Sequence, residues 1–220
     1  LKSRRRQPAF YRHQSFMEEF LVVSGIFDFE KALNGALLLD IQTGTIAHQW
    51  LFDDKLFFDN AKQYDHHLFT VLPDGSVIFA KDEGDGALYR YSSCGELLWE
   101  IPGNFHHSIA KRKDNLYWVL GSPQMVNQSK DTISLLEVDS GTIVKTIFLD
   151  EIHLKNQDKN VFSLKWVSHN NNDDKFHVND ADPLLQDLAA SFPQFDVGDL
   201  LVSYRHANLV YVLDPNTLDV

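Results

Sequence analysis

Short apolar runs separated by polar turns repeat along the chain. Residues 66–80 and residues 106–120 align without a gap: each begins with two histidines and has two apolar runs joined by a turn, centred on Asp74 in one and on Asp114 in the other. Each segment is followed by two more apolar runs around a glycine-containing turn. Short runs bounded by such turns are typical of β-strands, so the pattern predicts a repeated unit of four antiparallel strands.

Parts of the same unit recur at both ends. Residues 35–51 match its second half, and a further unit opens at Phe176-His177 and continues through residues 198–213. Four short strands at a spacing of roughly 40 to 45 residues indicate the blades of a β-propeller. We therefore predict an all-β chain in which residues 1–220 form a single propeller domain with about four visible blades, incomplete at the C-terminus and at the N-terminus. A β-sandwich with coincidental internal similarity is the alternative, and the gapless match argues against it.

Two segments depart from the repeat. An insertion separates Leu149 from Phe176. Beyond it, residues 183–190 predict a short inserted helix, because Asp182 is a good N-cap residue and Pro183 suits the first helical position. Three leucines would form the apolar face of this helix: Leu184, Leu185 and Leu188.

Composition and charge exclude several classes of partner and site. Hydrophobic residues make up 44% of the 220 residues and charged residues 23%, as in an ordinary globular protein. The formal net charge of −11 opposes a nucleic-acid partner. The single cysteine, Cys94, excludes an internal disulfide and a cysteine-based zinc site, and no apolar run is long enough to predict a membrane span.

Histidines at the heads of the repeat units are the first candidate site residues. They are five of the ten histidines: His66, His67, His106, His107 and His177. Equivalent positions in successive blades lie around one axis, so we expect these imidazoles to gather at the mouth of the channel. There they could act as nucleophile, proton carrier or cation. For any one of them, a hydrogen bond that caps a turn is the simpler explanation.

Arg205 is the second candidate. Alternation along a strand at residues 200–205 places Leu201, Ser203 and Arg205 on one face, opposite Leu200, Val202 and Tyr204. A guanidinium at the end of a strand, near histidines, suits the oxygens of a sulfate or phosphate group. A surface ion pair with one of the 31 acidic residues is the alternative.

These segments resemble the arylsulfotransferase family. The family pattern runs from a His-x-Asn-Asp segment to a strand ending in Ser-x-Arg and then to a strand closing in Asp-Pro. The matching residues are Phe176-His177-Val178-Asn179-Asp180, Ser203-Tyr204-Arg205 and Asp214-Pro215. In addition, Phe105-His106-His107-Ser108-Ile109 is similar to the preceding His-His segment of the family. The resemblance covers roughly residues 34–220.

The resemblance implies a six-bladed propeller enzyme that transfers a sulfuryl group from an aryl sulfate donor to a phenolic acceptor, without a cofactor. In such enzymes a histidine attacks sulfur and carries the group between the two half-reactions. By motif, His106 or His107 would act with His177 and Arg205, binding sulfate oxygens and stabilising or protonating the leaving phenolate. The Phe-His match between units favours His106. The resemblance places the nucleophilic histidine beyond Val220, and it implies a periplasmic or otherwise exported protein.

Further expectations concern substrate contacts and rival functions. Asn179 is expected to bind substrate, and Phe105, Phe176 and Tyr204 could stack on a phenol ring, although core packing is the simpler explanation for each aromatic residue. One alternative function is a metal site made of three repeat histidines with Asp180 as a carboxylate ligand. Another is a propeller that acts as a ligand-binding or protein-interaction scaffold without catalysis.

Overall fold

The computed structural model describes residues 19–28, 33–52, 68–81, 86–124, 132–159, 177–205 and 207–220. The chain divides into two compact units, Leu1–Leu56 and Phe57–Val220. His66, His67 and Phe176, which the sequence singled out, lie outside the described residues. The single domain expected over the whole chain stays a prediction. In the described parts, no helix is long and apolar enough to cross a membrane.

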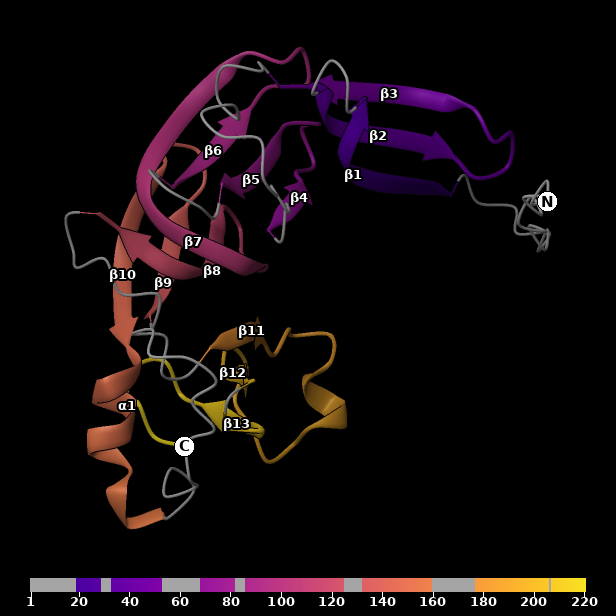
Figure 1. Cartoon of the computed structure of the whole chain (residues 1–220). Coiled ribbons are helices and arrows are strands. Elements are labelled where there is room, and N and C mark those ends of the chain that lie inside the picture. Colours follow the sequence, from indigo (N-terminus) through magenta and orange to yellow (C-terminus); the bar gives the residue numbers. More distant parts are fainter. Residues whose placement is uncertain are drawn as a thin grey trace, which may run out of the picture. The chain divides into compact units, whose positions relative to one another are not determined.

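The first unit contains a three-stranded antiparallel sheet. Its strands, in spatial order, are β1 (Phe20–Asp28), β2 (Leu33–Asp40) and β3 (Ile46–Leu51) (Figure 1). The partial repeat expected at residues 35–51 is therefore β2, a turn and β3. Asp40 stabilises this turn, because its Oδ1 accepts hydrogen bonds from the backbone nitrogens of Thr43 (3.0 Å) and Gln42 (2.8 Å). These bonds, chiefly that from Thr43, hold the pKa of Asp40 below the usual range of Asp.

The second unit opens with seven antiparallel strands whose spatial order follows the sequence. They are β4 (Phe69–Val71), β5 (Val77–Lys81), β6 (Ala87–Tyr91), β7 (Leu97–Lys113), β8 (Leu116–Pro123), β9 (Thr132–Glu137) and β10 (Thr142–Phe148). The long, curved β7 joins two four-stranded groups, because residues 97–102 pair with β6 whereas residues 103–113 pair with β8 (Figure 1). The two aligned repeats are therefore consecutive meanders, and the last strand of the first continues as the first strand of the second.

A close approach between β7 and β8 requires glycine at one position. Gly121 has a φ of 105°, in a region that side chains disfavour. A Cβ atom at this position would lie 1.8 Å from the carbonyl oxygen of Asn104, in the paired strand. Any side chain there would force the two strands apart near the segment that carries His106 and His107.

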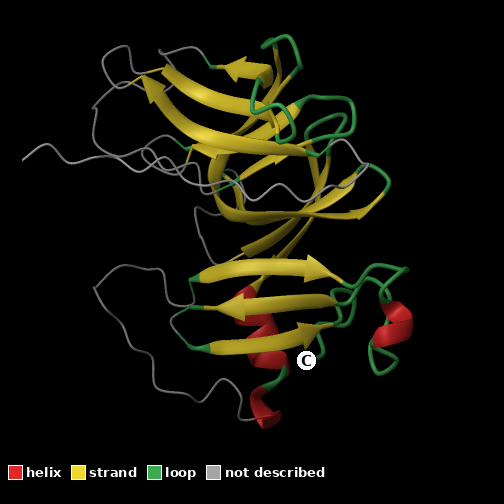
Figure 2. Ribbon diagram, turned by 90° about the vertical axis from the view of Figure 1, so that its right-hand side faces the viewer, coloured by secondary structure: helices red, strands yellow, loops and turns green. Residues whose placement is uncertain are grey.

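A third sheet follows α1 (Leu149–Lys155) and the 3₁₀ turn η2 (Gln157–Lys159). Its strands, in spatial order, are β11 (Val178–Pro183), β12 (Leu200–Tyr204) and β13 (Leu209–Leu213). Figure 2 shows the three strands side by side with α1 behind them. The insertion expected after Leu149 thus begins with a helix that the hydrophobic pattern did not indicate.

The helix expected at residues 183–190 is wrong. Asp182 and Pro183 extend β11 and pair with Leu201 and Leu200 of β12, and the connection contains only the 3₁₀ turn η3 (Ala189–Ser191). Pro183 is tolerated because it is the last residue of an edge strand. Pairing with β12 satisfies backbone groups cooperatively, whereas a helix of about two turns has a costly nucleus and little to stabilise it.

The strands β8 and β9 bury both of their faces. Alternate residues of β8 face opposite hydrophobic clusters: Trp118 and Leu120 pack with α1 and the third sheet, whereas Tyr117 and Val119 pack with residues of β5 and β6. Within the second unit, the middle meander therefore lies between the first meander and the third sheet. Burial on both faces explains why β8 and β9 are almost continuously apolar.

A buried arginine fastens the turns of the first two meanders together. Arg90, in β6, donates from Nη2 to Asp74 Oδ2 (2.8 Å), from Nε to Ser76 Oγ (3.0 Å) and from Nη1 to the carbonyl oxygen of Val138 (3.0 Å). Trp99 Nε1 donates to the same carbonyl (2.8 Å). The hydrogen bonds from Ser76, together with the charge of Arg90, hold the pKa of Asp74 below the usual range of Asp.

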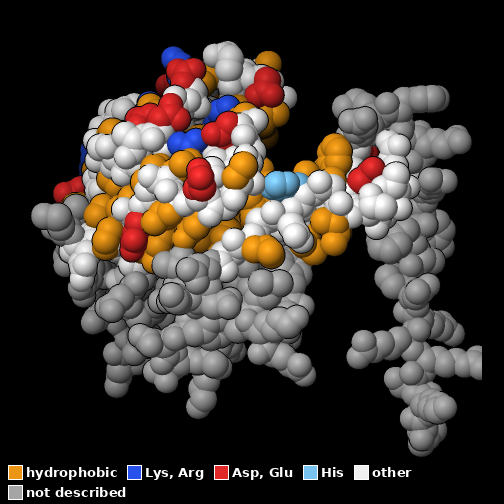
Figure 3. All heavy atoms as spheres, turned by 90° about the horizontal axis from the view of Figure 1, so that it is seen from above, with side chains coloured by type: hydrophobic (Ala, Val, Ile, Leu, Met, Phe, Trp, Pro, Cys, Tyr) orange, Lys and Arg blue, Asp and Glu red, His pale blue; other side chains and the backbone are white. Residues whose placement is uncertain are grey.

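The described surface mixes charged and apolar side chains. On the face drawn in Figure 3, Lys and Arg side chains stand next to Asp and Glu side chains, with apolar groups between them. Such interspersed charge agrees with the net charge of −11 in offering nucleic acid no broad basic surface on this face.

Candidate functional site

The candidate site lies where β7 and β11, from different sheets, run close to each other. Each strand has an irregularity at this place: the register of β7 shifts between His106 and Ile109, and that of β11 shifts between Val178 and Asp180. Extra residues in a strand interrupt the strict alternation of side chains and turn some of them in new directions. The two bulges therefore present residues that a regular strand would have directed elsewhere.

His107, in the bulge of β7, contacts His177, which directly precedes β11. Their Nε2 atoms lie 3.1 Å apart, and their ring centroids are 5.0 Å apart with the planes inclined by 55°. Both residues have a positive φ, 54° for His107 and 48° for His177, a left-handed conformation that is uncommon without glycine. At this distance the two nitrogens can share one proton, with one nitrogen as the donor and the other as the acceptor.

The structure distinguishes the two neighbouring histidines of β7. His106 pairs with Leu120 in the regular part of the ladder and is buried, with its ring edge-on to that of His107 (centroids 5.0 Å apart). His107 belongs to the bulge and is half-buried. Of the two candidates, His107 is thus the one that contacts His177, whereas the Phe-His match had favoured His106.

A second side-chain contact joins the same two bulges. Ser108 Oγ donates a hydrogen bond to Asp180 Oδ1, which also accepts one from the backbone nitrogen of Ala181 (3.0 Å). Asp180 comes three residues after His177, and Ser108 follows His107 directly. Two polar contacts, one between imidazoles and one between hydroxyl and carboxylate, therefore connect β7 to β11 side by side.

Asp182 adds a second carboxyl group to this edge of β11. The bulge places Val178 and Ala181 in the core, so Asp180 and Asp182 share the opposite face of the strand. Loss of hydration at the Asp182 carboxyl, then the nearby charge of Asp180 and a hydrogen bond between the two side chains, raise the pKa of Asp182. The pair therefore holds a proton more readily than separate Asp side chains do.

Arg205 lies directly beside His177 in the backbone. Its backbone nitrogen donates to the carbonyl oxygen of His177 (2.9 Å), and its side chain is exposed. The predicted alternation is confirmed, because Leu200, Val202 and Tyr204 are buried while Leu201 and Arg205 are exposed. Among the described residues, no carboxylate forms an ion pair with Arg205, whose guanidinium can bind an anion at this end of β12.

Three of the four expected substrate-contact residues are among those the structure describes, and they lie in different surroundings. Asn179 is exposed, at the bulge of β11. Phe105 is fully buried in the core between the first two meanders, and Tyr204 is buried between β8 and β13. We therefore assign neither aromatic residue a substrate contact.

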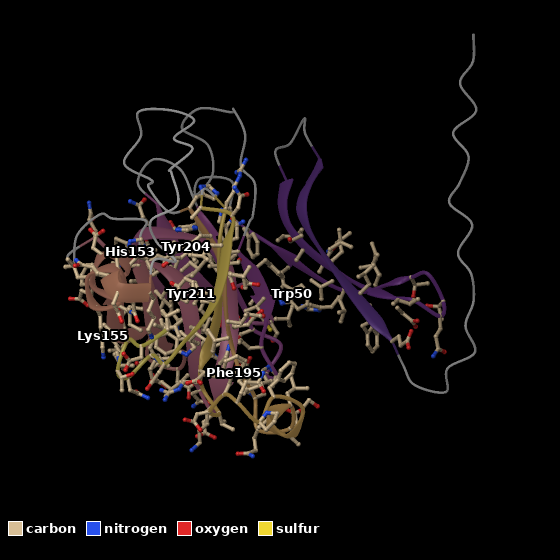
Figure 4. The ribbon with its side chains drawn as sticks, turned by 90° about the horizontal axis from the view of Figure 1, so that it is seen from below. Trp50, His153, Lys155, Phe195, Tyr204 and Tyr211 are labelled. Atoms are coloured by element: carbon tan, nitrogen blue, oxygen red, sulfur yellow. The ribbon has the colours of Figure 1, made fainter. Side chains whose placement is uncertain are left out.

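The hydroxyl of Tyr204 has a partner within the core. It shares a hydrogen bond with the hydroxyl of Tyr211, whose ring lies edge-on at 5.2 Å between centroids. His153 of α1 lies on the other side of Tyr204, at 6.4 Å between ring centroids, and Figure 4 shows the three rings close together. Burial raises the pKa of Tyr211 and lowers that of His153, which favours the neutral form of both.

The arrangement suits an anion. Within the described ranges, no group of three His, Cys, Asp or Glu side chains is placed to hold a metal. The imidazole pair offers one proton to a nearby acceptor, and Arg205 offers a charged group with several donors. Such groups can hold the oxygens of a tetrahedral oxyanion and protonate a leaving group.

Sequence reasoning missed two members of this site. Ser108 was only part of the His-His segment, and Asp182 was expected to cap a helix. The sequence offers one weak signal for each residue: Ser108 follows His107 directly, and Asp182 comes two residues after Asp180. The contact partner of Ser108, however, comes from a strand that is distant in sequence, since Ser108 and Asp180 are separated by 72 positions.

Comparison with known proteins places this site in a family. Among solved structures, the crystal structure of the computationally designed Ika4 protein is similar over 93% of this chain and 94% of that chain, with 12% sequence identity and a TM-score of 0.43. No curated protein matches the chain. The family model described as arylsulfotransferase (ASST) matches residues 68–220, which include both meanders and the third sheet. Because this match covers more than half of the chain, the protein belongs to the arylsulfotransferase family.

Proposed function

We propose that this protein transfers a sulfuryl group from an aryl sulfate donor to a phenolic acceptor, with His107, His177 and Arg205 at the reacting group. One observation carries the proposal. In a chain of the arylsulfotransferase family, two histidines from separate sheets are 3.1 Å apart, and one of them is bonded through its backbone to the residue that bears an exposed guanidinium. Cationic and proton-donating groups gathered in this way match the charge of a sulfate ester.

Sulfuryl transfer takes place in two half-reactions. In the first half-reaction, a histidine nitrogen forms a bond to sulfur while the bond from sulfur to the aryl oxygen breaks, and the phenolate leaves with the electron pair. In the second, the acceptor phenol loses its proton, its oxygen bonds to sulfur, and the nitrogen–sulfur bond breaks. Arg205 would bind the sulfuryl oxygens throughout, and the imidazole pair would give a proton to the departing phenolate and regain one from the acceptor.

The remaining residues have supporting roles in this proposal. His106, buried and edge-on to His107, would hold the orientation of that ring. Asn179, exposed at the bulge of β11, would donate its amide to a sulfuryl or phenol oxygen. We assign the nucleophile of the double transfer to none of the described residues.

The proposal includes a six-bladed β-propeller as the scaffold. Its support is the meander topology, the passage of β7 from one meander to the next, and two hydrophobic cores on opposite faces of the middle meander. Successive blades of a propeller are packed in the same manner around an axis. We further propose a periplasmic or otherwise exported location, from the family resemblance alone.

The test is sulfuryl transfer from a chromogenic aryl sulfate to phenol by the full-length protein. Losing one group that stabilises transition-state charge costs about 10²- to 10³-fold in kcat, so we expect losses of this order in His107→Ala, His177→Ala and Arg205→Ala. His48→Ala, a histidine change in the first unit, is the control and should retain activity. Arg205→Lys should recover only part of the loss, because an ammonium lacks the planar fork of donors.

Two results would contradict the proposal. A folded protein without activity over varied phenolic donors and acceptors would leave a ligand-binding or scaffolding role as the better explanation. Full activity in the folded His177→Ala and Arg205→Ala variants would show that sulfuryl transfer takes place elsewhere. Circular dichroism of each variant establishes that it is folded before its activity is compared.

A further inference from the structure

The contact between β7 and β11 is made by side chains. β7 forms its ladders with β6 and β8, and β11 forms its ladder with β12; among the described strands, no ladder joins β7 to β11. In a sheet, the ladder fixes the spacing between neighbouring backbones. Here that spacing depends instead on the packing of the two sheets and on the polar contacts that cross between them.

One of these contacts is well suited to fix a distance. Ser108 Oγ donates to Asp180 Oδ1, and hydrogen bonds to an ionised carboxylate are shorter and stronger than those between neutral groups. A serine side chain is short and has a single rotatable bond before its oxygen, so the bond restrains the backbone closely. The backbone nitrogen of Ala181 donates to the same carboxylate oxygen (3.0 Å) and limits how far the carboxylate can turn.

The imidazole pair needs such a restraint. A nitrogen-to-nitrogen distance of 3.1 Å is within the range of a hydrogen bond, and an increase of 1 Å would break it. Both histidines also have left-handed backbone conformations, which carry a cost unless the surrounding structure holds them. Ser108 directly follows His107 in the chain. Loss of its hydrogen bond to Asp180 would therefore displace His107 first.

We propose that Ser108 and Asp180 are positioning residues, whose hydrogen bond holds His107 and His177 at the distance where they share one proton. The catalytic consequence rests on the sulfuryl transfer proposed above, whereas the shared proton does not depend on it. His107 and Ser108 are adjacent in the chain, His177 and Asp180 are three residues apart, and two side-chain contacts join one pair to the other.

The neighbouring charged groups are compatible with this role. His106 faces His107 from β7, Asp182 accompanies Asp180 on β11, and Arg205 lies beside His177 at the end of β12. The side chains of Asp182 and Asp180 also share a hydrogen bond, and the pKa of Asp182 is raised, chiefly because its carboxyl loses hydration. An ionised Asp180 is the form that accepts most strongly from the Ser108 hydroxyl.

The first test observes the shared proton directly. Nuclear magnetic resonance of ¹⁵N-labelled full-length protein detects a scalar coupling between two nitrogens across an N–H···N hydrogen bond. We expect this coupling between His107 and His177 in the unaltered protein and in Ser108→Thr, which keeps a hydroxyl, and its loss in Ser108→Ala. Persistence of the coupling in Ser108→Ala would overturn the proposal.

A matched variant controls for loss of a serine hydroxyl in general. Ser140 Oγ donates to Glu137 Oε2 (2.5 Å) in the turn between β9 and β10, so Ser140→Ala removes a bond of the same kind away from the site. The coupling should survive in Ser140→Ala. Thermal unfolding of the two alanine variants shows whether the lost coupling follows from a general loss of stability; equal destabilisation with coupling lost in both would also overturn the proposal.

The second test measures the catalytic consequence. A displacement of about 1 Å at reacting groups can lower the rate about 10²-fold, so we expect kcat of Ser108→Ala to fall by roughly 10- to 100-fold with KM changed by less than about threefold. Ser108→Thr should recover kcat. Asp180→Asn should retain more activity than Asp180→Ala, because the amide oxygen still accepts from Ser108. Equal losses in the two Asp180 variants would instead indicate a role for its charge and overturn the positioning role.

The two tests separate the two proposals. If the unaltered protein transfers no sulfuryl group but the coupling is present and depends on Ser108, the positioning role stands and the proposed function fails. If the protein is active and Ser108→Ala retains both its kcat and the coupling, the proposed function stands and the positioning role fails.

Discussion

Replacing Arg90 by Met tests how far a buried guanidinium stabilises this fold. Only 9% of the Arg90 side chain is exposed, and three hydrogen bonds join it to Asp74, Ser76 and Val138. Methionine fills nearly the same volume but makes none of these bonds. The substitution therefore removes the link between the turns of two successive meanders while largely preserving the packing.

The expected loss in the free energy of unfolding depends on whether each former partner of Arg90 finds another hydrogen-bond donor in the Arg90→Met variant. The Asp74 side chain is 56% exposed, so water replaces the lost donor, and Ser76 Oγ still donates to Asp74 Oδ1 (2.6 Å). The carbonyl of Val138 keeps the hydrogen bond from Trp99. No acceptor is thus left buried and unpaired. Three hydrogen bonds of about 1 kcal/mol each, offset in part by the cost of burying the guanidinium, give a loss of about 2 kcal/mol.

Urea unfolding measures this loss as a change in the midpoint at constant slope. Lys113→Met, which removes an exposed cation from β7, is the control and should change the free energy of unfolding by less than about 0.5 kcal/mol. The Arg90 effect should also depend on pH. Because the folded pKa of Asp74 is lowered, its contribution is present above the usual pKa of Asp and is lost as pH falls through the lowered value.

A loss below about 0.5 kcal/mol for Arg90→Met would refute this reasoning. It would mean that the cost of removing water from the guanidinium on folding equals the free energy gained from its hydrogen bonds. A loss above about 4 kcal/mol would equally contradict it, because only an uncompensated buried charge or a collapsed core produces such values.

Three further predictions concern other parts of the second unit. Gly121→Ala should destabilise the protein by more than about 3 kcal/mol, or prevent folding, because the new methyl group meets a carbonyl oxygen of β7 in a left-handed conformation; thermal unfolding checks this, and a near-neutral change would contradict the close approach. Tyr211 should stay neutral through the pH range where exposed tyrosines ionise, because burial raises its pKa. The contribution of neutral Tyr211 to the free energy of unfolding is therefore complete below the ordinary tyrosine pKa, and it is lost as pH rises through the raised pKa. Ultraviolet titration tests this: the late-ionising step of the unaltered protein should be missing from Tyr211→Phe, and an unchanged late part of the curve would contradict the prediction. Asp182→Asn should raise the melting temperature at neutral pH by removing repulsion from Asp180, and the gain should disappear as pH falls to the ordinary pKa of Asp; a gain that persists in acid would contradict the charge explanation.

The strands were largely predictable from local pattern. The two apolar runs expected after each aligned segment are β6 and the first part of β7 in one unit and β9 and β10 in the other, and the alternation along residues 200–205 gives the buried and exposed faces of β12. Turn residues and alternation act over a few positions, so sequence alone specifies them. The helix expected at residues 183–190 failed, because its local signals were weaker than pairing with a strand whose first residue, Leu200, is distant in sequence.

Long-range packing was not predictable to the same degree. Arg90 lies 14 residues from Ser76 and 48 from Val138, and nothing in its neighbourhood marks it as buried. An arginine is exposed in most proteins unless partners satisfy its donors. The partners here come from turns of two different meanders, so the burial of Arg90 follows from the tertiary structure.

By itself, the sequence determined which residue types come to the site and which family they resemble: the paired histidines at the head of a repeat, the His177-x-Asn179-Asp180 segment and Arg205 at the end of a strand. These features are local or periodic, and periodicity is carried by the chain. The tertiary structure decided that His107, rather than His106, contacts His177, and that Ser108 bonds to Asp180. The physical reason is that the bulge in β7 redirects His107 and Ser108, the bulge in β11 redirects Asp180, and the register of each bulge depends on the partner strand.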